Sequence, residues 1–399
     1  MNSVVRMAVL SDLHARRLPD RTIVTTWVRP DQEPRSDNPL HTLDEYITQR
    51  GLTADVLLCP GDLCDQADWS ALGYAWKMVK SAARALGASE IIATVGNHDI
   101  DSRGTHRPLH LDDGLRSRAL ATFPMRSPAR REAFWRSRVT AVRRDGWQVV
   151  VLNSSIMAYL DNTIRDVGTV DDAALGEIRS AIEGETRPVN VLLCHHHPMR
   201  WTRLDRTDNS EMHNGPELVQ LLEDHPGQWT MIHGHRHQPH LEYLPGGSDA
   251  TVRLACGSVG AQLSGRLGSH VRNQIHIVEF HVDTAANLSL GIAGQVRSHS
   301  WRPVTGWSVA SDRDGLPAVS GFGFHGSPAP LARRLVTFAR NLQLPALERA
   351  QMLSVEPALE YLLPADVVKL RNELANTHGC ELDQDMQGVL SRLKLPVVP

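Results

Sequence analysis

The chain has 399 residues, of which 41% are hydrophobic and 22% charged, and its formal net charge is −3. This balance is typical of a folded globular protein and excludes a disordered chain, and the length allows one large domain with a smaller one. The slightly acidic charge provides no global field that would recruit nucleic acid or anionic lipid.

No apolar run approaches the roughly 20 residues that span a bilayer, so we expect no membrane contact. The first apolar stretch, Val4–Leu10, runs directly into the polar residue Asp12, unlike a secretory leader. The five cysteines include no close CxxC pair, which is typical of reduced thiols. We therefore expect a cytoplasmic protein.

Short apolar runs alternate with helical patterns, which is typical of an α/β layered fold. We predict strands at Val5–Leu10, Asp55–Cys59, Ile91–Val95, Trp147–Leu152, Val189–Cys194, Thr230–His233 and Thr251–Cys256. The clearest helix is predicted from Trp69 to Leu86, because apolar residues recur there at steps of three and four and Gly87 follows. Later antiparallel strands are predicted at Asn273–Val282 and Leu288–Ala293.

Two long polar segments, residues 15–38 and 100–130, interrupt this pattern. Loops of such length in a compact domain are usually functional or disordered, so both are candidates for contact with a substrate. The candidate residues in the second loop and after Pro198 are Arg103, His106, Arg107, Arg203 and Arg206. The sequence gives no reason to assign a substrate contact to any one of these residues.

The composition changes after about residue 311. A glycine-rich stretch through Phe322 and Gly326 predicts a linker, and apolar residues beyond it have helical spacing interrupted by prolines. We predict a main domain over residues 1–310 and a small helical region over residues 327–399. That region is expected to pack on the core, to mediate homo-oligomerisation or to dock a protein partner.

Five polar blocks follow predicted strands. They are Asp12-Leu13-His14, Gly61-Asp62, Gly96-Asn97-His98-Asp99, His195-His196-His197-Pro198 and Gly234-His235-Arg236-His237. Because the carboxyl ends of parallel strands meet at one sheet edge, we expect these blocks to form one site. Residues at i and i+2 of an extended segment point the same way, so Asp12 and His14 would aim at one point. The same holds for His235 and His237.

The side chains of these blocks have the chemistry of a metal centre. Carboxylate, imidazole and amide oxygen suit Mn, Fe or Zn, and the blocks hold no cysteine for a thiolate site. Their seven candidate ligands are too many for one ion. They suffice for two divalent ions that share a bridging carboxylate and a hydroxide.

The order of the blocks resembles the calcineurin-like metallophosphoesterase superfamily, whose pattern is DxH, GD, GNH[DE], H and GHxH. The resemblance covers scattered blocks from residue 5 to about residue 290. It implies a four-layer α/β/β/α sandwich with two metals at the sheet edge. By position it implies that one metal binds Asp12, His14 and His237, that the other binds Asn97, His196 and His235, and that Asp62 bridges them. His196 is chosen because the family's ligand stands two residues before a proline, and His195 and His197 are expected to lie behind it.

The same resemblance places His98 over the substrate. Two cations would polarise the phosphoryl group and activate the hydroxide that attacks phosphorus, and His98 would protonate the leaving alkoxide. Asp65, three residues after Asp62, is expected to orient His98. The alternative for Asp65 is that it caps the helix that begins near Trp69.

Protein phosphatases of this superfamily continue with GDxVDRG and GNHE, whereas this chain has GDLCDQA and GNHD and lacks the arginine that grips phosphate. The HHHP and GNHD blocks and the stretch Asn214–Leu218 resemble the bacterial class III cyclic-nucleotide phosphodiesterase branch. We therefore expect hydrolysis of a cyclic nucleotide or another small phosphodiester. The alternatives are a DNA or RNA nuclease, which the acidic charge disfavours, and a phosphomonoesterase. A non-catalytic scaffold is disfavoured because all seven ligands and His98 are present.

Overall fold

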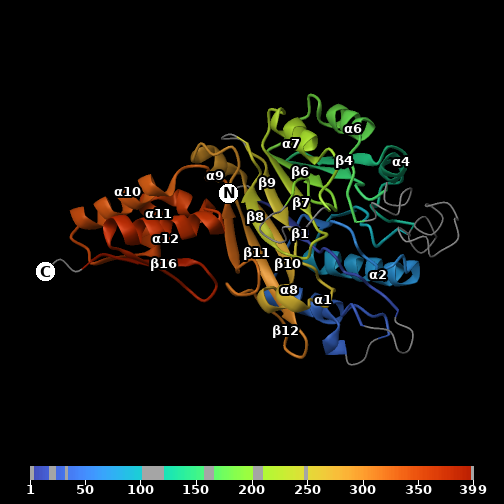
Figure 1. The fold of residues 1–399 in the computed structure, drawn as a ribbon, viewed down its shortest axis with the longest axis horizontal. Helices are drawn as coiled ribbons and strands as arrows, with labels where there is room; N and C mark the ends of the chain where they lie inside the picture. The colour runs from blue at the N-terminus through green and yellow to red at the C-terminus, as the bar shows by residue number, and fades with distance from the viewer. Residues whose placement is uncertain are drawn as a thin grey trace.

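The computed structural model describes residues 4–17, 24–31, 35–100, 121–156, 166–200, 210–246 and 250–396. These residues form two large mixed β-sheets with helices on their outer sides, and a C-terminal region that projects to one side (Figure 1). The predicted α/β fold class and its layered sandwich are therefore confirmed. No helix among these residues is long and apolar enough to cross a membrane. The five cysteines are free and buried, and a cytoplasmic location stays a prediction.

The first sheet has the strand order β12-β11-β10-β1-β2-β3, with β13 also paired to β11. Its strands are β1 (Val4–Val9), β2 (Val56–Cys59), β3 (Glu90–Ala93), β10 (Asn273–His281), β11 (Gly294–Arg302), β12 (Gly306–Val309) and β13 (Val319–Phe322). Strands β1, β2 and β3 are parallel, and the other pairings are antiparallel. The carboxyl ends of these three parallel strands therefore meet at one edge of the sheet.

The second sheet has the order β4-β5-β6-β7-β9-β8. Its strands are β4 (Val139–Arg144), β5 (Trp147–Leu152), β6 (Val189–Leu193), β7 (Trp229–His233), β8 (His240–Tyr243) and β9 (Val252–Ala255). Strands β5, β6, β7 and β9 are parallel and buried along their whole length. Parallel strands covered on both faces have continuous apolar sequences, which is why the sequence predicted them to within two residues.

Helices cover the outer faces of the sheets. They are α1 (Pro39–Arg50), α2 (Trp69–Leu86), α4 (Pro128–Ser137), α6 (Asp172–Ile182), α7 (Gly215–Glu223), α8 (Gly265–His270) and α9 (Val282–Asn287), preceded by the short helix η1 (Arg35–Asp37). Helix α2 has the predicted bounds. Its Asp68 side chain accepts a hydrogen bond from the Ala71 backbone N at 3.1 Å, and Gly87 ends the helix at φ 71°.

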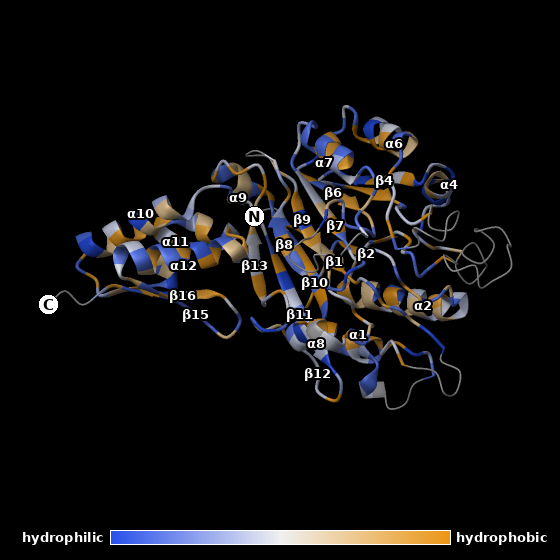
Figure 2. Ribbon diagram, viewed as in Figure 1, coloured by the Kyte–Doolittle hydropathy of each residue, from blue (hydrophilic) through white to orange (hydrophobic). Residues whose placement is uncertain are grey.

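One hydrophobic core lies between the sheets. Val9 and Leu57 of the first sheet belong to the same buried cluster as Val151 and Leu193 of the second. A second cluster fills the space between the other face of the second sheet and helices α6 and α7. Strands such as β1, β2 and β6 are accordingly largely apolar (Figure 2). Two packed sheets with helices outside give the predicted four layers.

The C-terminal region has its own hydrophobic core. It contains α10 (Pro328–Asn341), β14 (Ala346–Glu348), α11 (Arg349–Val355), η4 (Pro357–Tyr361), α12 (Pro364–His378), β15 (Glu381–Gln384) and β16 (Leu390–Lys394). The predicted helices are present, but an antiparallel sheet of order β14-β16-β15 accompanies them, so the purely helical description is incomplete. Domain limits at residues 310 and 327, homo-oligomerisation and partner docking stay predictions.

Two predicted segments are wrong. Residues 288–293 form the turn after α9 rather than a strand, and the antiparallel strand begins at Gly294. The predicted linker contains β13, which pairs with β11 from Arg297↔Val319 to Gly294↔Phe322. Its glycine serves close packing: a Cβ on Gly321 would lie 2.3 Å from the Glu360 carbonyl oxygen.

Glu279 of β10 joins three strands of the first sheet through ion pairs. Its carboxylate lies 3.0 Å from Arg6 Nε on β1 and 2.6 Å from Arg297 Nε on β11. Burial would raise the pKa of Glu279, but hydrogen bonds from His281, Arg297 and Arg6 outweigh it and lower the pKa to about 2. The pairs therefore stabilise the fold above the ordinary pKa of 4.5, and this contribution is lost as the pH falls towards 2.

A Glu279→Gln variant is expected to be less stable at neutral pH by about 1 kcal/mol, a figure that allows for solvent screening. The difference should shrink as the pH falls from about 4.5 towards 2, because the carboxyl is protonated first in the unfolded chain and only near pH 2 in the folded protein. Urea unfolding of both proteins at neutral and acid pH measures it. A difference that is constant with pH would contradict the role of the ionised carboxylate.

Candidate metal centre

The five polar blocks lie together where strands β1, β2, β3, β6 and β7 end. Their backbone is not extended as predicted: Asp12 (φ 51°), His14 (φ 48°) and Asp62 (φ 51°) lie in the left-handed region, as do His235 (φ 80°) and His237 (φ 55°). Such conformations are uncommon for residues other than glycine and cluster at functional sites. The side chains converge because tight turns, rather than an alternating strand, aim them.

Backbone hydrogen bonds hold these turns against one another. The Asp12 N donates to the Gly61 carbonyl at 3.2 Å, and the His14 N donates to the Asp62 carbonyl at 2.9 Å. The His235 N donates to Asp12 Oδ1 at 3.0 Å. Loops from both sheets are thus fixed in one rigid arrangement.

Asp12, His14 and His237 form the first group of candidate ligands, and their donor atoms lie within 4.8 Å of one another. The Nε2 atoms of His14 and His237 are 2.8 Å apart, and His237 Nε2 is 3.4 Å from Asp12 Oδ1. Burial lowers the pKa of His14 to about 4, so its imidazole is neutral at physiological pH. A neutral imidazole has the lone pair that a metal requires.

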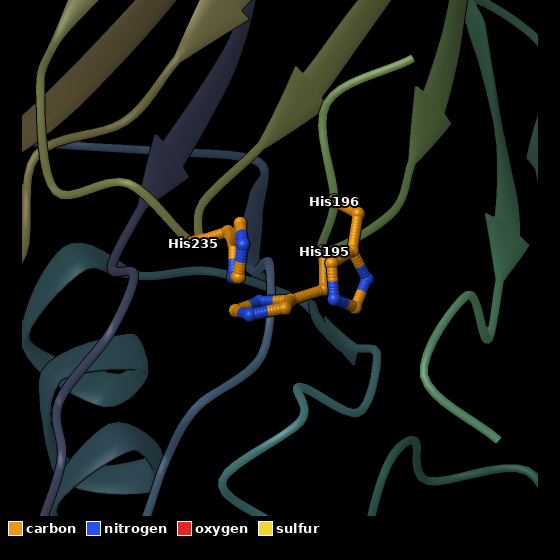
Figure 3. Close-up of side chains that lie close together, drawn as sticks. All are labelled: His195, His196 and His235. Carbon is orange, nitrogen blue, oxygen red and sulfur yellow. The ribbon is translucent and has the colours of Figure 1, made fainter. Parts of the chain in front are cut away.

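His195, His196 and His235 form the second group (Figure 3). The ring of His196 is oriented by Ser154, whose Oγ lies 2.9 Å from His196 Nδ1. Burial lowers the pKa of both His196 and His235 well below its ordinary value. Neither His196 Nε2 nor His235 Nε2 has a hydrogen-bond partner among the described residues, although both atoms are buried.

An unpartnered buried nitrogen is costly, and a bound metal would satisfy it. The donor set of imidazoles, carboxylates and an amide oxygen therefore fits Mn, Fe or Zn.

Asp62 lies between the two groups. Its Oδ2 is 3.7 Å from His14 Nε2 and 3.2 Å from His195 Nε2, while its Oδ1 accepts a hydrogen bond from the His98 N at 2.8 Å. Burial would raise the pKa of Asp62, but the surrounding histidines outweigh it and keep the carboxyl ionised. A Cβ on Gly96 would lie 2.0 Å from Asp62 Oδ1, so only glycine permits this approach.

His195 occupies a place that the sequence did not predict for it. Its Nδ1 lies 2.9 Å from the Pro60 carbonyl, which fixes Nδ1 as the donor. Its Nε2 lies 3.1 Å from Asn97 Oδ1 and within reach of Asp62. His195 is thus a candidate ligand beside His196, rather than a residue behind it. His197 is buried but belongs to none of the candidate groups that the described residues form.

The pKa of His195 shows how strongly the centre is negative. Burial alone would lower this pKa, but Asp62 and Asp12 together outweigh it and raise the pKa to about 9. Two carboxylates thus attract positive charge to this point, whether a proton or a metal ion supplies it.

His98 and Asp65 form the predicted pair. His98 Nδ1 lies 2.7 Å from Asp65 Oδ1, and Asp65 Oδ2 accepts hydrogen bonds from Arg16 at 3.1 Å and from Thr25 at 3.3 Å. The capping alternative for Asp65 is wrong, because Asp68 caps helix α2. Burial would raise the pKa of Asp65, but the hydrogen bond and charge of His98 lower it to about 2.

Asp99 is a residue that the sequence analysis missed. It is fully buried, and its two oxygens accept hydrogen bonds from the Cys64 N and the Gly96 N, each at 2.9 Å. Asp99 therefore joins the loop that carries Asp62 to the loop that carries Asn97. Its position as the fourth residue of the GNHD block was the available signal.

The candidate substrate-contacting residues Arg103, His106, Arg107, Arg203 and Arg206 lie outside the described residues. Arg16, in the first polar loop, is described, and it contacts Asp65.

The profile of the calcineurin-like phosphoesterase family matches residues 5–263 of the chain. No match was found among curated proteins. Similar solved structures include a dimetal phosphatase from Danio rerio, which is 11% identical with a TM-score of 0.48; the match covers 74% of this chain and 96% of that one. A purple acid phosphatase from yellow lupin is 14% identical with a TM-score of 0.49, and the match covers 75% of this chain and 52% of that one, about half its length. Because both TM-scores are below 0.5, the family match alone carries the assignment.

Proposed function

Since the chain belongs to the calcineurin-like phosphoesterase family, we propose that it hydrolyses a small phosphodiester, such as a cyclic nucleotide, with two divalent metal ions. The observation that carries this proposal is the position of Asp62. Its carboxylate lies 3.7 Å from His14 of one donor group and 3.2 Å from His195 of the other. A carboxylate so placed is suited to bridge two ions.

The first ion would be held by Asp12, His14 and His237, and the second by Asn97, His235 and His196 or His195. Bound there, Mn, Fe or Zn ions would polarise the phosphoryl oxygens and lower the pKa of a water molecule. The backbone contacts of the turns fix the donors before any ion arrives, so little reorganisation is needed at the reaction step.

His98 supplies the proton that the leaving group needs. The Asp65 carboxylate accepts the Nδ1–H of His98 at 2.7 Å, which leaves Nε2 as the nitrogen that donates to the substrate. The His98 side chain is 24% exposed, whereas that of Asp65 is 6% exposed, so the imidazole is accessible and its partner is not. An alkoxide is a poor leaving group, and general acid catalysis is worth most for such a group.

The charge of the site favours a diester over a monoester. A monoester carries nearly one more negative charge at neutral pH and is usually gripped by an additional cation. Arg16, one arginine near the donor groups, is bound to Asp65 at 3.1 Å and is thereby committed to the His98 pair. Its engagement with Asp65 supports the preference for a singly charged phosphodiester.

A substrate panel with the manganese-loaded protein tests the proposal. It compares cyclic nucleotides, linear dinucleotides, bis(nitrophenyl) phosphate, nitrophenyl phosphate, and single- and double-stranded DNA, with His98→Ala as the control. We expect kcat/KM for the best small diester to exceed that for the monoester at least about tenfold, a transition-state preference of about 1.4 kcal/mol. Preference for the monoester or for DNA would contradict the proposal and select one of the two alternatives.

A further inference from the structure

A cavity of about 560 Å³ lies between the first sheet and the C-terminal region, and none of its lining residues belongs to the metal centre. Strand β13 and helix η4 form one side, and α12 with the β15–β16 hairpin forms the other. The tip of this hairpin reaches back towards the first sheet (Figure 1). Gly388 at the tip packs so closely on Pro317 that a Cβ there would lie 2.9 Å from the proline ring.

The size and lining of the cavity are those of a small-molecule site. Four buried leucines line it: Leu359 from η4, Leu362 directly after η4, Leu382 from β15 and Leu390 from β16. Ligand sites of a few hundred Å³ occur preferentially between domains and combine such apolar walls with a few polar groups.

The carboxylates that line the cavity are engaged or exposed. Glu360 pairs with Arg349 at 2.6 Å, and Asp383 pairs with Lys394 at 2.9 Å. Asp385 Oδ1 accepts two backbone N–H groups of its own hairpin, both at 2.9 Å. The remaining carboxylate, that of Asp312, is exposed to water.

The basic residue Arg371 of α12 is left without a charged partner. Its guanidinium donates to Gln384 Oε1, and no carboxylate in the described ranges forms an ion pair with it. We infer that the cavity binds a small organic anion. Its apolar body would contact the leucines, and its anionic group would pair with Arg371.

A small anion fits this surface better than nucleic acid does. Helix, strand, two helices and a hairpin follow one another in the C-terminal region with sheet order β14-β16-β15, which is the winged-helix arrangement. The helix equivalent to α12 commonly enters the DNA major groove in helix-turn-helix proteins. Here Val367, Val368 and Arg371 of α12 face the cavity instead, and the hairpin carries the acidic residues Asp383 and Asp385.

Two dyes that differ only in charge test the inference with the full chain. Anilinonaphthalene sulfonate has an apolar body and one sulfonate, and phenylnaphthylamine has the same rings without it. We expect one molecule of the sulfonate dye to bind per chain. Arg371→Gln should weaken the affinity for this dye at least tenfold and change the affinity for the neutral dye less than twofold. Arg371→Lys should retain part of the affinity, and Val367→Trp should weaken both dyes by filling the cavity.

Arg333→Gln is the matched control, because Arg333 is an exposed arginine of α10 that does not line the cavity. Circular dichroism checks the fold of each variant. Equal affinity of the sulfonate dye for wild type and Arg371→Gln would overturn the inference, as would the absence of binding. Displacement of the dye by a DNA duplex at similar concentration would overturn it in favour of a nucleic-acid surface.

Discussion

An Asp62→Asn protein is expected to lose metal ions and activity together. The Asp62 carboxylate lies close to both donor sets, with Oδ2 at 3.2 Å from His195 Nε2 and 3.7 Å from His14 Nε2. An amide keeps the shape but removes the negative charge that both ions share. We expect fewer than two ions per chain after manganese loading and a fall in kcat of roughly a thousandfold or more.

Elemental analysis of the desalted protein and the rate on the best diester measure the two losses. Asp145→Asn is the matched control, because Asp145 is an exposed carboxylate in the turn between β4 and β5. The Asp62→Asn variant should still fold, since the oxygen of the new Asn side chain can accept the hydrogen bond that Asp62 Oδ1 receives from the His98 N. Retention of two ions at an unchanged rate would show that Asp62 does not bridge them.

The part of the site that the sequence predicted depends on strand ends. Strands β5 and β6 are buried and parallel, with Val149 opposite Val191 and Val151 opposite Leu193. Such strands require largely apolar runs, so their ends can be located from composition alone. The polar blocks at those ends were therefore expected to meet, and the contacts between Asp12, Asp62 and His235 agree with this. The left-handed turns were not predicted. Asp and His are enriched at positive φ, but the conformation is so uncommon for residues other than glycine that residue type alone does not locate it.

The choice among His195, His196 and His197 depends on contacts that no local pattern contains. Three identical neighbours have the same chemistry, and their roles differ only through distant partners. His195 is oriented by the Pro60 carbonyl, 135 positions away, and His196 by Ser154, 42 positions away. Sequence spacing from Pro198 therefore selected His196 as the ligand and left His195 as a residue expected behind it.

The C-terminal sheet was missed for a related reason. Strand β14 has three residues and β15 has four, too few for an alternating pattern to stand out. Strand β13 reads Val-Ser-Gly-Phe, in which Ser and Gly resemble a linker. Its strand conformation comes from pairing with β11. Pairing between residues far apart in the chain thus overrides weak local propensity.

Replacing His98 by Ala is expected to slow hydrolysis without emptying the metal centre. His98 lies beside the donor groups but is held by Asp65, so its loss leaves Asp12, Asp62 and the liganding histidines in place. We expect kcat to fall roughly a hundred- to ten-thousandfold for a substrate with an alkoxide leaving group. The fall should be much smaller for a nitrophenyl diester, whose leaving group needs no proton.

The contrast between leaving groups separates proton donation from a structural role. A variant that is merely misfolded would lose both activities equally, and an equal loss would contradict general acid catalysis by His98. Manganese content measured on the same samples checks that both ions remain bound. His225→Ala is the matched control, because His225 is a partly buried histidine that contacts Ile182 and Trp229, away from the site.

Asp65→Asn is the finer test of the same pair. The Asp65 carboxyl is ionised throughout the working range, since its pKa is about 2, and it therefore favours the protonated form of His98. Without that charge the imidazolium loses its proton more readily, so the alkaline limb of the rate profile should move to lower pH while KM stays nearly constant. Asp65 also accepts hydrogen bonds from Arg16 and Thr25. An unchanged profile would mean that, with these partners present, the charge of Asp65 has no influence on His98.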